Sequence, residues 1–214
     1  MSAKANLSWE QIWQGAAPRF DQSEPNLLLL EYLKDIEPSS TDETWFLPLC
    51  GRSIDIDFLL RTGRKVVMND FCQDPVISVF QRCKIEYSLR KEQGFLCLDS
   101  EKLFGYVGDF FRISKYWVSR CNHSYDRAGM VIFDKPQREE YARTLANLHN
   151  SGHQYLLVGF DYQSEEIDSK ANYPLPLPFK EVVDLFSKDY LIEAKSSYTS
   201  EQPFLHTLYL MTKK

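Results

Sequence analysis

The chain has 214 residues, of which 43% are hydrophobic and 26% are charged, and its formal net charge is -5. This balance excludes a mainly disordered chain and argues against a general nucleic-acid binder. Only 9 residues are glycine, a share of about 4% against an average near 7%. Most glycine-rich phosphate-binding loops are therefore excluded as well.

Membrane segments and metal sites are not expected either. No apolar run approaches the ~18 residues that a membrane helix needs, and the first residues (MSAKANLSWEQ) lack the apolar stretch of a signal peptide. The five cysteines are scattered without a C-x-x-C pair, which favours reduced thiols over a structural zinc site. We expect a cytoplasmic protein with no metal.

The first 40 residues predict a helical segment that precedes the sheet. Trp9 and Trp13 are four residues apart, so they share one face of a helix. Pro25 suits the first turn of a second, apolar helix over 26–36.

Strands and helices alternate after this N-terminal helical segment. Strands are expected at 44–49, 65–70, 95–99, 105–111, 124–133, 154–160, 190–198 and 204–212, and helices at 53–60, from Asp74 onward, at 137–150 and at 179–186. This alternation predicts a parallel sheet with helices on both faces, and the last two strands predict an antiparallel pair at one edge. Such sheets bind ligands beyond the carboxyl ends of their strands, so the segments there are the candidate site.

The ends of the first two strands carry a glycine and an acid. Gly51 lies in the turn before a helix, where it lets the backbone approach a ligand closely. A pyrophosphate loop would carry three glycines, so a ligand without a pyrophosphate fits better. Asp70 follows the second strand and could accept both hydroxyls of a ribose. The alternatives are an ordinary turn and an exposed carboxylate.

Two further strand ends carry candidate residues: an acid beside aromatic residues at one end, and a cation at the other. Asp109 and Phe110 could bind and cover an adenine, although this signal is weak alone. Arg127 has a planar fork suited to a carboxylate. The alternative is an internal ion pair with Asp126, because charge in a strand is costly to bury unpaired.

Taken together, these residues resemble the thiopurine S-methyltransferase family in its bacterial form, from Trp9 to the C-terminus. The matching motifs occur in order: Trp9, Trp13 and Phe20; Pro48-Leu49-Cys50-Gly51-Arg52-Ser53-Ile54-Asp55; Gly108-Asp109-Phe110-Phe111; Tyr125-Asp126-Arg127-Ala128; Arg138 to Ala142; and Asp161-Tyr162. Each motif is short, but the set in this order and spacing is specific.

The resemblance implies a class I, Rossmann-like α/β fold: a doubly wound, mostly parallel seven-stranded sheet with an antiparallel edge strand and an N-terminal helical cover. It implies one domain over 1–214, with the cover at 1–40 and the core at 41–214, and S-adenosylmethionine as cofactor. The residues that would bind the cofactor are Trp9, Trp13, Phe20, Leu49, Gly51, Asp70, Asp109, Phe110 and Arg127.

Departures from the family pattern concern the second strand and the loop that borders the substrate. Met68 replaces a glycine, Asp70 replaces a glutamate, and Asn172-Tyr173-Pro174-Leu175 stands where the family has G-P-P-F. The long loop 162–178 is expected at the rim of the pocket, opposite the N-terminal helix.

The implied function is methyl transfer to a small soft nucleophile: a thiol, a thiopurine-like compound, or a selenium or tellurium compound. Such acceptors react as anions, so no strong base is required, and the four histidines are interpreted as structural or surface residues. Arg127 would orient substrate or cofactor. We expect a monomer that binds a small molecule and neither nucleic acid nor membrane. The alternative is a degenerate relative that binds the cofactor, or nothing, without turnover.

Overall fold

The computed structural model describes residues 3–15, 18, 20–34, 36–40, 42–127, 129–162, 175–199 and 204–214. Most of the predicted rim loop, at 163–174, lies outside these residues. No helix of the described part is long and apolar enough to cross a membrane.

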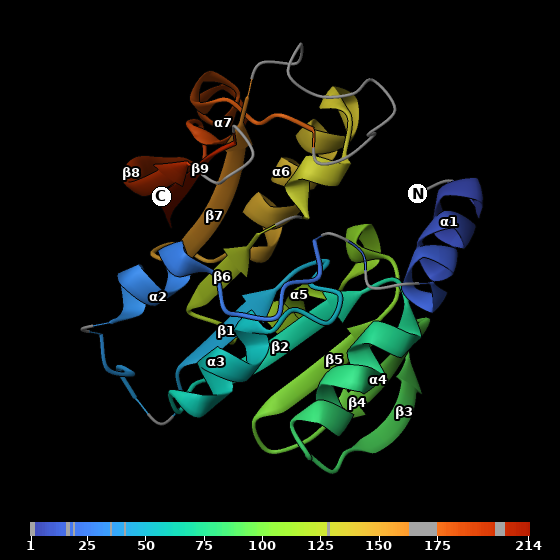
Figure 1. The fold of residues 1–214 in the computed structure, drawn as a ribbon. Coiled ribbons are helices and arrows are strands. Elements are labelled where there is room, and N and C mark those ends of the chain that lie inside the picture. The colour runs from blue at the N-terminus through green and yellow to red at the C-terminus, as the bar shows by residue number, and fades with distance from the viewer. Residues whose placement is uncertain are drawn as a thin grey trace.

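One sheet of nine strands runs through the described residues, in the order β3-β4-β5-β2-β1-β6-β7-β9-β8 (Figure 1). The strands are β1 Thr44–Leu47, β2 Lys65–Asp70, β3 Ser88–Glu92, β4 Phe95–Asp99, β5 Leu103–Val107, β6 His123–Asp126, β7 Gln154–Asp161, β8 Tyr190–Thr199 and β9 Leu205–Lys213. The five central strands are mutually parallel. Antiparallel strands flank them at both edges.

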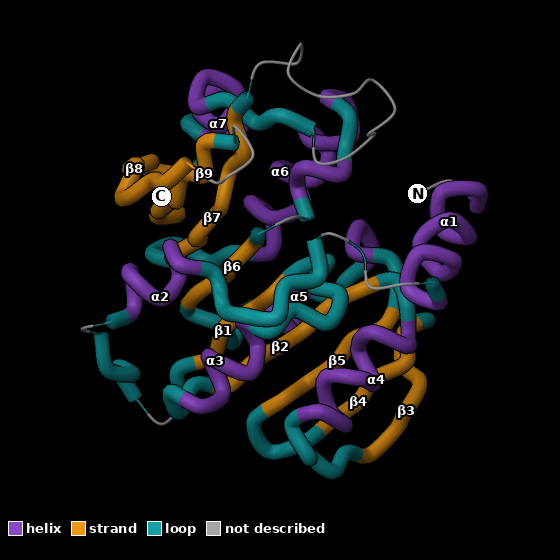
Figure 2. Tube along the Cα trace, in the orientation of Figure 1, coloured by secondary structure: helices purple, strands orange, loops and turns teal. Residues whose placement is uncertain are grey.

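Helices cover both faces of this sheet, as Figure 2 shows. The α-helices are α1 Ala3–Gln14, α2 Leu27–Leu33, α3 Asp55–Arg61, α4 Gln73–Arg82, α5 Lys115–Val118, α6 Lys135–Leu148 and α7 Phe179–Phe186, and two short 3-10 helices span Phe110–Arg112 and Met130–Ile132. Buried side chains of α2, α3 and α4 form one apolar core with the sheet, and those of α5, α6 and α7 form the other. The predicted doubly wound fold is confirmed.

The predicted strand over 124–133 is too long. β6 ends at Asp126, whose carboxylate accepts the backbone N–H of Gly129 at 2.8 Å and so turns the chain out of the sheet. The number of strands also differs from the expected seven, because β3 and β4 form an additional antiparallel hairpin beside β5.

Other boundaries moved by a few residues. The second helix begins at Leu27 after Asn26, whose side chain accepts the N–H of Leu28. α4 begins at Gln73 rather than at Asp74. α6 begins after Asp134, which forms a reciprocal capping box with Gln137, and this box satisfies free N–H groups of the first turn.

Candidate functional site

The turn between β1 and α3 has an unusual backbone. Leu49 has a φ of 46° and Gly51 a φ of 52°, so two of its residues are left-handed. A leucine rarely adopts this conformation, and such strain tends to persist at functional sites. The turn is tied to β2, because the N–H of Cys50 donates to the carbonyl of Asn69 at 3.1 Å. The β1 turn and the end of β2 therefore act as one rigid unit.

Asp70 lies directly against this turn. One carboxylate oxygen accepts the N–H of Gly51 at 2.8 Å, and the other accepts the N–H of Cys72 at 2.9 Å. The residue is only 8% exposed, and burial raises its pKa to about 6 despite these hydrogen bonds. Each oxygen keeps lone-pair capacity for a further donor, so the Asp70 carboxylate can accept additional hydrogen bonds.

The end of β5 is held beside Asp70. The N–H of Gly108 donates to the carbonyl of Asp70 at 2.9 Å, and the amide nitrogen of Asn69 donates to the carbonyls of Tyr106 and Gly108. Asp109 follows at once, and its carboxylate accepts the N–H of Phe111 at 3.1 Å. The predicted acids Asp70 and Asp109 are thus brought to the same edge of the sheet.

The ring of Phe110 has a different environment from the one expected. It is 1% exposed and packs against Phe111 and Tyr141, with ring centroids 5.5 and 4.6 Å apart. The side chain therefore belongs to the core beneath Asp109. Gly108 is required here because a Cβ on it would lie 2.4 Å from the ring of Phe95.

Aromatic residues of the N-terminal segment cover the Gly51 turn. Trp9 and Trp13 both contact Phe20 edge-on, at 6.1 and 5.5 Å. A Cβ on Gly51 would lie 2.5 Å from the ring of Trp13, so glycine permits this close approach. An ion pair between Arg52 and Asp21 ties the same segment to the turn, and the guanidinium of Arg52 lies 5.3 Å from the Trp13 ring centroid.

Arg127 pairs with Asp55 rather than with its neighbour Asp126. Its Nε lies 2.9 Å from the Asp55 carboxylate, and its Nη2 donates to the Ser53 hydroxyl at 3.3 Å. Asp126 instead accepts hydrogen bonds from the hydroxyls of Tyr141 and Tyr155. The end of β6 is therefore connected to the β1 turn across the carboxyl edge of the sheet.

Comparisons with known proteins assign this arrangement to a family. The family model described as thiopurine S-methyltransferase matches residues 4–206. The chain belongs to the thiopurine S-methyltransferase family. A relative named thiopurine S-methyltransferase from Shewanella sp. (strain MR-4) is 27% identical over 96% of this chain and 98% of its own. One of the same name from Teredinibacter turnerae is 32% identical over 72% of this chain and 71% of its own.

Solved structures share the fold. A SAM-dependent methyltransferase from Anabaena variabilis superposes with a TM-score of 0.71 at 12% identity, over 100% of this chain and 96% of that one. The N-methyltransferase NodS from Bradyrhizobium japonicum, in complex with S-adenosyl-L-homocysteine, gives 0.69 at 10% identity, over 98% of each chain. The predicted family and enzyme class are confirmed: an S-adenosylmethionine-dependent S-methyltransferase.

The residues present fit this cofactor. S-adenosylmethionine has no pyrophosphate, and the single glycine of the turn, Gly51, gives a close backbone approach beside the buried carboxylate of Asp70. The substitution of glycine by Met68 does not disturb this geometry, because its side chain is fully buried in the core and β2 runs unbroken to Asp70.

Two residues with structural importance escaped the sequence reasoning. Asp55 was seen only as part of a motif, yet it is fully buried and holds Arg127. Arg138 is 4% exposed and donates to the carbonyls of Met130, Leu175 and Pro176 and to the Glu181 carboxylate. It fixes residues 175 and 176, before α7, against the start of α6. The motif from Arg138 to Ala142 is the sequence signal for it.

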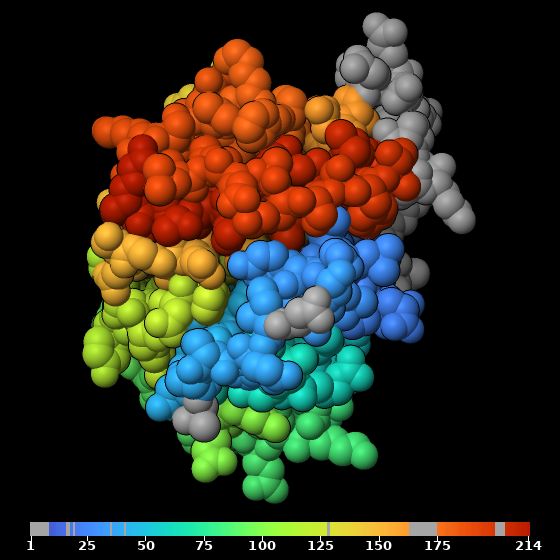
Figure 3. All heavy atoms as spheres, turned by 90° about the vertical axis from the view of Figure 1, so that its left-hand side faces the viewer, coloured from blue at the N-terminus to red at the C-terminus, as the bar shows by residue number. Residues whose placement is uncertain are grey.

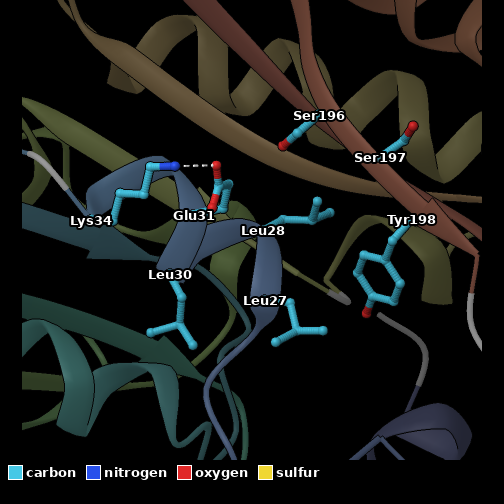
Figure 4. A pocket seen from close by; sticks show the side chains of 8 residues that line it. All are labelled: Leu27, Leu28, Leu30, Glu31, Lys34, Ser196, Ser197 and Tyr198. Atoms are coloured by element: carbon cyan, nitrogen blue, oxygen red, sulfur yellow. Dashed lines mark hydrogen bonds and ion pairs between the residues drawn. The ribbon is translucent and has the colours of Figure 1, made fainter.

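A separate hollow of about 440 Å³ lies between α2 and β8. In Figure 3 the blue α2 region lies against the orange-red C-terminal strands, and Figure 4 shows Leu27 and Tyr198 facing the same space. Burial raises the pKa of Tyr198, and the positive charge of Arg127 partly offsets this rise. The hollow therefore lies within electrostatic reach of Arg127.

Proposed function

We propose that this protein transfers the methyl group of S-adenosylmethionine to a small soft nucleophile: a thiol, a thiopurine-like compound, or a selenium or tellurium compound. The observation that carries the proposal is the Asp70 carboxylate held 2.8 Å from the Gly51 N–H, at the carboxyl edge of the sheet of a thiopurine S-methyltransferase family member. When bound, the cofactor supplies an electrophilic methyl group on a sulfonium.

The role of the protein is to bind and orient. Asp70 accepts the ribose hydroxyls, Asp109 receives the adenine amino group above the buried ring of Phe110, and Leu49 and Gly51 line the methionine end. Trp9, Trp13 and Phe20 close the site from the N-terminal segment. In this proposal residues 1–40 are the cover of a single domain, 1–214, whose core is 41–214.

The acceptor is proposed to react as its anion. A thiol that ionises readily needs no strong general base, so holding it in line with the methyl group supplies several kcal/mol of the rate enhancement. Arg127 favours an anion near the site. Its contacts with Asp55 and Ser53 involve Nε and Nη2, so the other N–H groups of the guanidinium can donate to an acceptor. His149 and His153 are buried and hydrogen-bonded within the fold, in keeping with a structural role.

The runner-up is a degenerate relative that binds the cofactor, or nothing, without turnover. Its grounds are the altered end of the second strand, with Asp70 in place of a glutamate, and the altered loop at 172–175. The contact of Asp70 with the Gly51 turn supports cofactor binding under both readings, so a measurement of turnover separates them.

The test is incubation of the protein with methyl-labelled S-adenosylmethionine and a panel of thiols, thiopurines, selenite and tellurite. We expect labelled product with at least one of them, and a loss of transfer in Asp70→Asn. The matched control is Asp74→Asn, which removes an exposed carboxylate four residues further on. Micromolar binding of S-adenosylmethionine without transfer to any acceptor would refute the proposal and support the runner-up.

A further inference from the structure

A buried carboxylate connects three segments that are distant in the sequence. Asp55, the first residue of α3, is 0% exposed. One oxygen accepts the backbone N–H of Asn26 at 2.7 Å, while the other accepts the Tyr125 hydroxyl at 3.2 Å and lies 2.9 Å from Arg127 Nε. Asp55 therefore joins the segment before α2 to the residue that follows β6.

The same carboxylate lies beside the Arg127 guanidinium. Nε forms an ion pair with Asp55 at 2.9 Å, Nη2 donates a hydrogen bond to the hydroxyl of Ser53, and this hydroxyl also contacts the Asp55 carboxylate at 3.1 Å. The side chain of Arg127 is 14% exposed, and among the described residues no acceptor holds its Nη1 group. A guanidinium fixed at two points presents its remaining donors in one direction, which a flexible cation cannot do.

We propose that Asp55 is a positioning residue for methyl transfer, which orients Arg127 so that its remaining N–H donors meet the anionic acceptor. The inference rests on the proposed function, because it takes the acceptor to be an anion bound at Arg127. The positive charge of Arg127 alone would be present without Asp55. The structure adds a defined direction, and small errors in the placement of a reactant reduce the rate strongly.

Two variants in the same helix separate positioning from general stability. Asp55→Asn keeps the shape and removes the charge that holds Arg127. The control, Asp57→Asn, removes the neighbouring first-turn acid, whose partner is Arg82. We expect Asp55→Asn to raise the KM for a thiol acceptor about tenfold, as for the loss of one charge-assisted hydrogen bond, with the Kd of S-adenosylhomocysteine changed by less than about twofold. Asp57→Asn should leave both values unchanged.

A double-mutant cycle shows whether Asp55 acts through Arg127. In Arg127→Gln, adding Asp55→Asn should raise the acceptor KM no further. Arg127→Lys keeps the charge without the two-point contact, so it should raise the KM as Asp55→Asn does, and it serves if Asp55→Asn fails to fold. Three results would overturn the inference. The first is a wild-type acceptor KM in Arg127→Lys, and the second is a double variant whose KM increase is the product of the two single increases. The third is a loss of S-adenosylhomocysteine binding in Asp55→Asn as large as its loss of acceptor binding.

A readout without turnover distinguishes this inference from the proposed function. The Nε–H resonance of Arg127, assigned by its loss in Arg127→Lys, should keep its wild-type chemical shift in Asp57→Asn. It should shift in Asp55→Asn because the carboxylate 2.9 Å away loses its charge, and an unchanged chemical shift there would overturn the positioning role. Absence of methyl transfer by the wild type would instead refute the proposed function while leaving this resonance to report on Asp55.

Discussion

Substituting Gly51 by alanine tests the close approach between the β1 turn and its aromatic cover. The new Cβ would lie 2.5 and 2.7 Å from two atoms of the Trp13 ring, whereas carbon atoms in contact normally stay about 3.5–4.0 Å apart. Trp13 must therefore move by about 1 Å or more. An aromatic contact contributes about 0.5–1.5 kcal/mol beyond its buried area, so cofactor affinity should fall by roughly twofold to twelvefold.

The matched control is Gly152→Ala, in the turn before β7. Gly152 has a φ of 81°, and no heavy atom lies within 4 Å of a Cβ built on it. Alanine in a left-handed conformation costs roughly 1–2 kcal/mol, so both variants should lose about this much free energy of unfolding. Only Gly51→Ala should also lose cofactor affinity.

The assays are urea unfolding for stability and calorimetry with S-adenosylhomocysteine for affinity. Tryptophan fluorescence reports whether Trp13 has moved. Wild-type affinity for S-adenosylhomocysteine in Gly51→Ala would refute the cover proposed here.

Three further predictions concern charged and polar groups. Cofactor affinity, measured by calorimetry, should fall about tenfold when the pH is lowered from neutral to about 5. Burial raises the pKa of Asp70, which is flanked by Cys50 and Cys72, to about 6. Only the ionised carboxylate accepts both ribose hydroxyls. Arg138→Met should lower the free energy of unfolding by about 3–5 kcal/mol in urea, because it breaks the ion pair with Glu181 and removes the donor that bridges three backbone carbonyls. Burial lowers the pKa of His153 from 6.5 to about 4. As the pH falls below about 6.5, the unfolded chain takes up a proton before the folded protein does, so the free energy of unfolding should drop by about 2 kcal/mol by about pH 5.

Each of these has a control and a contradicting result. Asp74→Asn should keep the pH dependence of binding, and an affinity independent of pH would exclude Asp70 as the titrating group. Lys180→Met removes an exposed cation of α7 and should leave the free energy of unfolding nearly unchanged. An equal loss of stability in Arg138→Met and Lys180→Met would contradict the stabilising role of the Arg138 contacts. For His153, the pH dependence of the free energy of unfolding is compared between the wild type and His153→Gln. Asp70 titrates in both proteins, so its contribution cancels in this comparison. Identical pH slopes in the two proteins would contradict the assignment.

The regular elements that the sequence predicted best are those with strong apolar patterns. β2 at Lys65–Asp70 and α7 at Phe179–Phe186 begin and end where expected. β3 was missed because its residues, Ser88–Glu92, are polar and mostly exposed, so that only pairing with β4 defines it. Local pattern therefore predicts buried strands well and polar edge strands poorly.

Sequence position predicts which candidate residues meet at the carboxyl edge of the sheet, but only some of their contacts. The proximity of Gly51 and Asp70 follows from the adjacency of parallel strands at their carboxyl ends. The partner of Arg127 could not be predicted in this way, because Asp55 lies in a different segment and Asp126 was the nearer acid in the sequence. Sequence spacing also could not show that the ring of Phe110 packs into the core.

The most direct test of the account is a crystal structure with S-adenosylhomocysteine bound. The account predicts the ribose hydroxyls within hydrogen-bond distance of the Asp70 carboxylate, the ligand against Gly51, and Trp13 over it. A ligand bound elsewhere on the sheet, or one that leaves Asp70 without a ribose contact, would contradict it.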